Sequence, residues 1–221
     1  MGLLRKVLSG TAKSVLAGAF LFGSFGNANA GNIPKWLQDY SVKSKTEIVE
    51  TERLRLNPEG DRIYFTPISC EKGYIQAREL AQKRFIEEYW GCNKDFWVSF
   101  GKRGTSINKV IPRNDLVNGF MSNETDYKLP HIHPFGDAVP SKEDLKYFLW
   151  LSNQNFPSKI SFPIISSKGV FDFSFTKPIS QTQAFMSYNP LRNLYKSNPK
   201  KLAEELSKMG FMRASYKHFE E

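Results

Sequence analysis

The spacing of two histidines and one aspartate constrains the fold of this 221-residue chain more than any other feature. His131 and His133 stand two positions apart in a short stretch bracketed by prolines, and Asp144 follows after ten further residues. Side chains at i and i+2 of a strand leave the same face, about 7 Å apart along the backbone. The spacing therefore predicts a strand that is followed by a helix, whose first turn brings Asp144 back over the two imidazoles.

These three side chains form a credible set of metal ligands. A catalytic zinc ion takes three protein ligands and leaves one position open, whereas a structural zinc ion is closed by four ligands, mostly Cys and His. The chain has only two cysteines and one further histidine, His218, so an open site is easier to assemble. The ligand types suit Zn²⁺ best, and other divalent ions stay possible. The alternative is two surface histidines and a carboxylate that complements a helix dipole.

The motif H-x-H-P, continued by P-S-x-x-D, resembles the signature of the JAMM (JAB1/MPN+) zinc metalloproteases. The resemblance implies that His131, His133 and Asp144 bind zinc and that Ser141 stabilises a tetrahedral intermediate. Ser141 is also a good helix N-cap, a role worth about 1 kcal/mol by itself, and both roles are compatible.

The same resemblance extends over residues 62–176 and implies an α/β fold, JAB/MPN-like, in which a curved mixed sheet is flanked by helices in three layers, as in cytidine deaminases. It implies a general base at the start of the strand that follows the first helix. Glu88, in a Glu-x-x-Gly motif similar to that of the family, is the expected base, and Glu87 is the nearest alternative. The chain looks most like bacterial JAB-like domains of exported or toxin-associated proteins.

Hydrophobic patterning predicts further elements without help from the resemblance. Apolar residues recur at helical intervals over 73–88, and Ser141 and residues 198–199 start two more helices. Short apolar and aromatic runs predict hairpins and single strands. The strand segments are 88–92 with 96–100, 160–166 with 170–175, and the single runs 107–111 and 129–134; residues 112–128 are expected to form a polar stretch. The aromatic cluster of the first hairpin is expected to be core rather than a ligand platform.

The first 30 residues have the layout of an export signal. Arg5 and Lys6 are followed by an apolar run of about 12 residues, and an Ala-x-Ala site ends at Ala30. The alternative, a transmembrane anchor, needs roughly 20 apolar residues. We therefore expect the mature protein to start at Gly31, to be periplasmic or secreted, and to keep no stable membrane anchor.

The charge of the chain argues against nucleic-acid partners, and its two cysteines allow one disulfide. Loss of residues 1–30 removes three basic residues and no acid, so the formal charge falls from +9 to +6. The remaining basic residues are interspersed with acids, which argues against a nucleic-acid groove. Cys70 and Cys92 are expected to form a disulfide in an exported chain, the alternative being two free thiols.

Together these patterns predict four segments: a signal peptide (1–30), an N-terminal extension (31–61), a JAB/MPN-like metallohydrolase domain (62–176) and a C-terminal helical extension (177–221). The expected activity is a zinc-dependent peptidase or isopeptidase acting on a protein or peptide. The alternatives are an inactive MPN-like binding scaffold and a secreted toxin-type hydrolase. The sequence indicates neither the particular substrate nor the oligomeric state.

Overall fold

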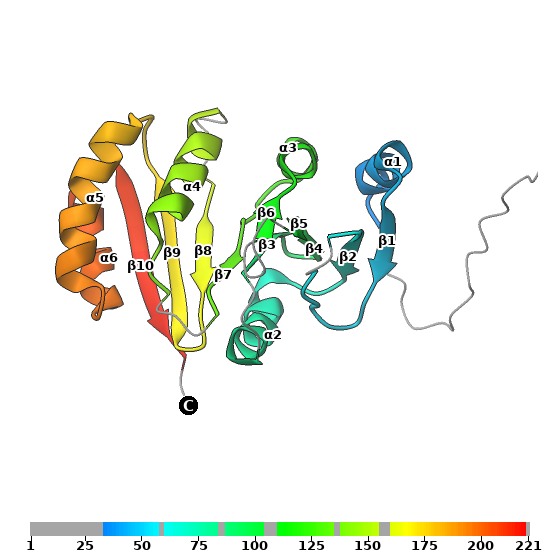
Figure 1. Ribbon diagram of the computed structural model, residues 1–221, viewed down its shortest axis with the longest axis horizontal. Coiled ribbons are helices and arrows are strands. Elements are labelled where there is room, and N and C mark those ends of the chain that lie inside the picture. The colour runs from blue at the N-terminus through cyan, green and yellow to red at the C-terminus, as the bar shows by residue number, and fades with distance from the viewer. Residues whose placement is uncertain are drawn as a thin grey trace, which may run out of the picture. The chain divides into compact units, whose positions relative to one another are not determined.

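A mixed β-sheet with helices packed against it forms the frame of the protein in the computed structural model (Figure 1). The structure describes residues 33–57, 60–83, 87–103, 110–134, 138–154 and 160–219. All of these residues belong to one compact unit, residues 31–221. The predicted signal peptide and residues 107–109 of a predicted strand lie outside the described residues.

The described strands are β1 (Glu47–Glu50), β2 (Arg62–Thr66), β3 (Glu88–Cys92), β4 (Trp97–Ser99), β5 (Gly101–Arg103), β6 (Val110–Pro112), β7 (His131–Ile132), β8 (Phe162–Ile165), β9 (Gly169–Phe175) and β10 (Met212–His218). The described helices are α1 (Lys35–Ser44), α2 (Cys70–Lys83), α3 (Asn114–Asn123), α4 (Lys142–Gln154), α5 (Gln181–Tyr195) and α6 (Pro199–Lys208).

Eight of these strands form one open sheet in the order β1-β2-β4-β3-β7-β8-β9-β10, and β5 pairs with β6 separately. The β1–β2 and β7–β8 pairs are parallel, and the other neighbours in the large sheet are antiparallel. The predicted α/β class, a mixed sheet flanked by helices, is therefore confirmed.

Helices cover both faces of the sheet. Figure 1 shows α2 on one side and α1, α3 and α4 on the other. Two hydrophobic clusters match this division: one joins α2 to Trp90, Trp97 and Ile132, and the larger one contains the buried faces of α1, α3, α4, α5 and α6. Because side chains alternate along a strand, neighbouring residues of β3 and β7 belong to different clusters.

Both predicted hairpins are present. Strands β3 and β4 pair antiparallel, as do β8 and β9. Trp90, Phe96, Trp97 and Phe100 are buried, which confirms that these aromatic residues of the first hairpin belong to the core. The first predicted helix is α2, which begins at Cys70, and the predicted helices near Ser141 and Pro199 are α4 and α6.

The two predicted extensions are continuous with the main sheet. Strand β1, from the N-terminal segment, pairs with β2, and β10, from the C-terminal segment, pairs with β9 along its whole length. The C-terminal segment, expected to be a helical extension, contains α5 and α6, and it also contains β10, an edge strand that the sequence did not predict. The expected polar stretch at 112–128 is wrong, since α3 buries Leu116, Val117 and Phe120 against the core.

A disulfide joins Cys70, at the start of α2, to Cys92, at the end of β3. The disulfide expected from the sequence is therefore present; it fastens the helix to the sheet and indicates folding in an oxidising compartment. Over the ranges that the structure describes, no helix combines the length and the apolar character needed to cross a bilayer.

Candidate metal centre

The first turn of α4 is held by a reciprocal pair of hydrogen bonds. The Ser141 N–H donates to Asp144 Oδ2 at 2.7 Å, and the Asp144 N–H donates to Ser141 Oγ at 3.0 Å. This is the geometry of a capping box, with Asp in the place of the usual Glu or Gln. The predicted N-cap role of Ser141 is thus present, and the cap fixes the direction of the Asp144 carboxylate.

That carboxylate lies against both histidines. Nε2 of His131 is 3.2 Å from Oδ1 of Asp144, and Nε2 of His133 is 2.9 Å from Oδ2. With metal–ligand bonds of about 2.0–2.1 Å, the ligand atoms of a tetrahedral zinc site lie about 3.3 Å apart. The structure therefore brings His131, His133 and Asp144 together at nearly the separation that a shared ion requires.

The tautomer of His131 leaves a lone pair directed at the site. Its Nδ1 is 3.2 Å from the backbone carbonyl oxygen of Glu88, which can only accept, so Nδ1 carries the proton of the neutral ring. In that neutral ring, Nε2 is a bare acceptor. It is buried and finds no partner with hydrogen-bond geometry among the described residues, although a carboxylate oxygen lies 3.2 Å away. Two buried acceptors that face each other in this way suit a cation between them.

Asp144 is ionised in this setting. Burial by itself would raise the pKa of this carboxyl, but positive charge on His131 and His133 outweighs burial and holds the pKa well below its usual range, and a cation bound between the same groups would act on Asp144 in the same direction. Tyr89 completes the wall: its ring stacks on His131 with centroids 4.0 Å apart, and its hydroxyl lies 3.5 Å from Asp144 Oδ1. Burial raises the pKa of Tyr89, so its hydroxyl stays protonated.

The acidic residue that reaches the histidines is Glu87. One carboxylate oxygen of Glu87 and one ring nitrogen each of His131 and His133 lie within 4.8 Å of one another, so these groups could hold a metal ion. Glu87 and His133 are partly exposed while His131 is buried, so solvent reaches this group from the side of Glu87 and His133. A carboxylate at this distance can be a further ligand or can accept a proton from a water molecule beside the ligands.

The structure does not bring Glu88, the expected base, to the histidines. In the β3–β7 ladder Tyr89 lies opposite His131 and Glu88 lies opposite Ile132. Alternation along the strand therefore directs the Glu88 side chain to the α2 face, away from the metal centre. There its Oε2 accepts the Asn57 N–H at 2.8 Å, and burial raises the pKa of Glu88 to about 7 against the opposing effect of its backbone donors and of Arg113.

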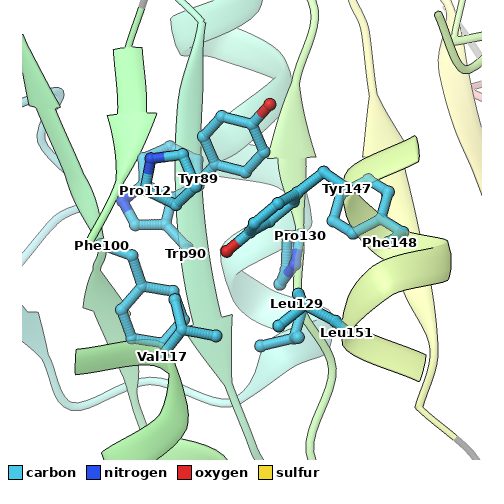
Figure 2. A pocket seen from close by; sticks show the side chains of 10 residues that line it. All are labelled: Tyr89, Trp90, Phe100, Pro112, Val117, Leu129, Pro130, Tyr147, Phe148 and Leu151. Atoms are coloured by element: carbon cyan, nitrogen blue, oxygen red, sulfur yellow. The ribbon is translucent and has the colours of Figure 1, made fainter. Parts of the chain in front are cut away.

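A small aromatic-lined pocket lies beside the candidate metal centre (Figure 2). Tyr89, which stacks on His131, is part of its wall, and so is Phe148, whose ring centroid is 6.4 Å from that of His131. Figure 2 shows Phe100 and Val117 on the side across from Tyr147. Its lining includes Val117 of α3 and Tyr147, Phe148 and Leu151 of α4, and none of the three candidate ligands.

Sequence reasoning placed Tyr89 in a core cluster and did not connect it with His131. The contact between Tyr89 and His131 follows from the pairing of β3 with β7, which cannot be read from the spacing of residues along the chain. His218, given no role from the sequence, lies on β10 and is exposed. Comparison of the chain with protein-family models, with curated proteins and with solved structures finds no match.

Proposed function

We propose that the protein is an exported, zinc-dependent peptidase or isopeptidase of the JAMM type. The observation that supports this most is the unpartnered lone pair of His131 Nε2, which faces the Asp144 carboxylate in a buried wall with Glu87 nearby. The resemblance of H-x-H-P and P-S-x-x-D to the JAMM signature supports the same function. The ligand set would be His131, His133 and Asp144.

When bound there, zinc would supply Lewis-acid chemistry, lowering the pKa of water toward about 7 and polarising a carbonyl group. Glu87 takes the proton of the attacking water and returns it to the leaving amine, the role first expected of Glu88. Ser141 Oγ accepts from the Asp144 N–H, and its own hydrogen is available to donate to the oxygen of the tetrahedral intermediate.

The disulfide and the signal-like N-terminus support a periplasmic or secreted location. The substrate would be a protein or a peptide, and cleavage would break an amide bond. An inactive MPN-like scaffold would keep the ligands and bind the metal without turnover.

The adjacent acids Glu87 and Glu88 provide a matched test of the proposed mechanism. Each residue is replaced by Gln, and hydrolysis of a proteome-derived peptide mixture and of isopeptide-linked peptides is followed by mass spectrometry. We expect Glu87→Gln to keep zinc and to lose turnover by about 10²-fold or more, the usual contribution of a general base. Glu88→Gln should cleave like the wild type.

Equal activity of Glu87→Gln and the wild type would contradict the proposed role of Glu87. Loss of zinc from Glu87→Gln would make Glu87 a ligand rather than the base. A wild-type chain that binds zinc but cleaves neither substrate class would favour the scaffold.

A further inference from the structure

The peptide group in front of α4 is held by α5, a helix outside the segment that resembles the JAMM domains. The Pro140 carbonyl oxygen accepts two hydrogen bonds, one from the Tyr188 hydroxyl and one from Arg192 Nε at 3.1 Å. A carbonyl oxygen has two lone pairs, so its accepting capacity is filled. Tyr188 is 1 % exposed, and burial raises its pKa, which keeps the hydroxyl a donor.

The other end of this peptide group contacts the candidate metal ligand. The Pro140 carbonyl and the Ser141 N–H belong to one amide, and that N–H donates to Asp144 Oδ2 at 2.7 Å. Hydrogen bonds at the carbonyl of an amide, above all one from a charged guanidinium, polarise the amide and strengthen its N–H as a donor. A continuous chain therefore runs from Tyr188 and Arg192 through one peptide group to the Asp144 carboxylate.

We propose that Tyr188 and Arg192 are positioning residues for metal binding, which orient and tune Asp144 through the Pro140–Ser141 peptide group. This inference rests on the proposed metal centre. Outer hydrogen-bond partners of metal ligands set the ligand's direction and its basicity, and their loss typically costs 10- to 100-fold in metal affinity. The C-terminal segment would then be part of the functional unit, because the peptide group before the Ser-x-x-Asp turn depends on it.

If α5 served only to pack against the core, removing the Tyr188 hydroxyl or the Arg192 guanidinium would not change metal binding. If the chain of hydrogen bonds matters, each removal would weaken it. The test variants are Tyr188→Phe, which keeps the ring and removes the hydroxyl, and Arg192→Met, which keeps a long stem and removes the charged donor. Matched controls are Tyr195→Phe, at the end of the same helix, whose ring also packs on the core, and Lys196→Met, at the C-cap of that helix, which removes an exposed positive charge.

Two measurements on the full chain separate the possibilities. The first is the proton chemical shift of the Ser141 amide in metal-free protein, recorded by ¹⁵N–¹H NMR. The second is the dissociation constant for Zn²⁺, obtained by competition with a chromophoric chelator, together with the visible absorption spectrum of the Co²⁺-loaded protein.

We expect both test variants to move the Ser141 amide proton upfield, to weaken Zn²⁺ binding by about tenfold and to alter the Co²⁺ spectrum. The two controls should leave all three readouts at wild-type values. An unchanged Ser141 shift, or a Zn²⁺ affinity within twofold of the wild type in both test variants, would overturn the inference. Equal losses in Tyr195→Phe would do the same, since packing would then explain them. A wild-type chain that binds no Zn²⁺ contradicts the proposed function instead, and the Ser141 shift then decides whether the chain of hydrogen bonds exists.

Discussion

His131 Nε2 lies 3.2 Å from Asp144 Oδ1, yet the two atoms are not aligned as a hydrogen bond. In the neutral ring the proton is on Nδ1, because the Glu88 carbonyl oxygen beside Nδ1 can only accept. A buried imidazole lone pair that faces a carboxylate is stabilised by a cation bound between them. Without a cation, two buried acceptors face each other at a cost in free energy.

Asp144→Asn should separate the metal-binding role of this residue from its capping role. The amide oxygen of Asn can still accept the Ser141 N–H, while the charge that attracts a cation is gone. We expect added Zn²⁺ to raise the Tm of the wild type, because an ion that binds only the folded state stabilises it. The same addition should leave the Tm of Asp144→Asn nearly unchanged; an equal increase in both proteins would argue against Asp144 as a ligand.

Glu88 should make the protein less stable as the pH rises. Its pKa is about 7 in the folded protein, above its ordinary value of 4.5, because the side chain is buried. The folded state then holds a proton that the unfolded state has released, so the stabilisation is complete below about pH 4.5 and is lost as pH rises through about 7. Glu88→Gln lacks this titration.

The free energy of unfolding of metal-free wild type and Glu88→Gln, measured in denaturant between pH 4 and pH 8, checks this. As the pH rises, the free energy of unfolding of Glu88→Gln should increase relative to that of the wild type, by an amount on the order of 3 kcal/mol. A difference that stays constant over this range would show that Glu88 keeps its ordinary pKa. Taking the difference removes the contributions of the histidines, which are common to both proteins.

The disulfide should contribute substantially to stability. It closes a separation of 22 residues around α2, and a loop of this size is expected to contribute about 3 kcal/mol through the unfolded state. Cys70→Ser/Cys92→Ser should therefore lower the free energy of unfolding by roughly this amount under oxidising conditions. Under reducing conditions the wild type should unfold like the variant, and equal stability of the two proteins in oxidising buffer would contradict the expectation.

Gly91, the glycine of the Glu-x-x-Gly motif, is required for close packing. A Cβ at this position would lie 2.4 Å from the Phe100 ring and 2.8 Å from that of Phe120. Gly91→Ala should cost about 1–3 kcal/mol by overpacking, measurable as a lower denaturant midpoint. Phe100→Leu in the same chain should recover part of the loss, and no recovery would mean that the strain lies elsewhere.

The sequence predicted that His131, His133 and Asp144 lie together because the geometry that joins them is local. Alternation puts His131 and His133 on one face, and the cap at Ser141 places Asp144 in the first helical turn. The choice between Glu87 and Glu88 depends on strand register, where a slip of one residue exchanges the two faces of the sheet. Register is set here by the pairing of β3 with β7, a long-range contact that patterning does not contain.

The missed elements have physical reasons as well. Helix α5 contains Pro190, which argues against a helix, although Ser180 and Gln183 form a capping box that marks its start. Strand β10 buries only Met212 and leaves its other six side chains at least partly exposed, so its hydrophobic pattern is weak, as is common at a sheet edge. Helix α5 packs against α4, and β10 pairs with β9, so both elements form through tertiary contacts.

The metal content of the protein tests the proposed metal centre most directly. Protein purified without chelators from cells supplied with zinc is analysed for metals by mass spectrometry, beside His131→Ala/His133→Ala and, as a control, His218→Ala. We expect about one zinc per chain in the wild type and the control, as an open three-ligand site would hold, and almost none in the double variant. Wild-type protein without metal, or a double variant that retains it, would contradict the account.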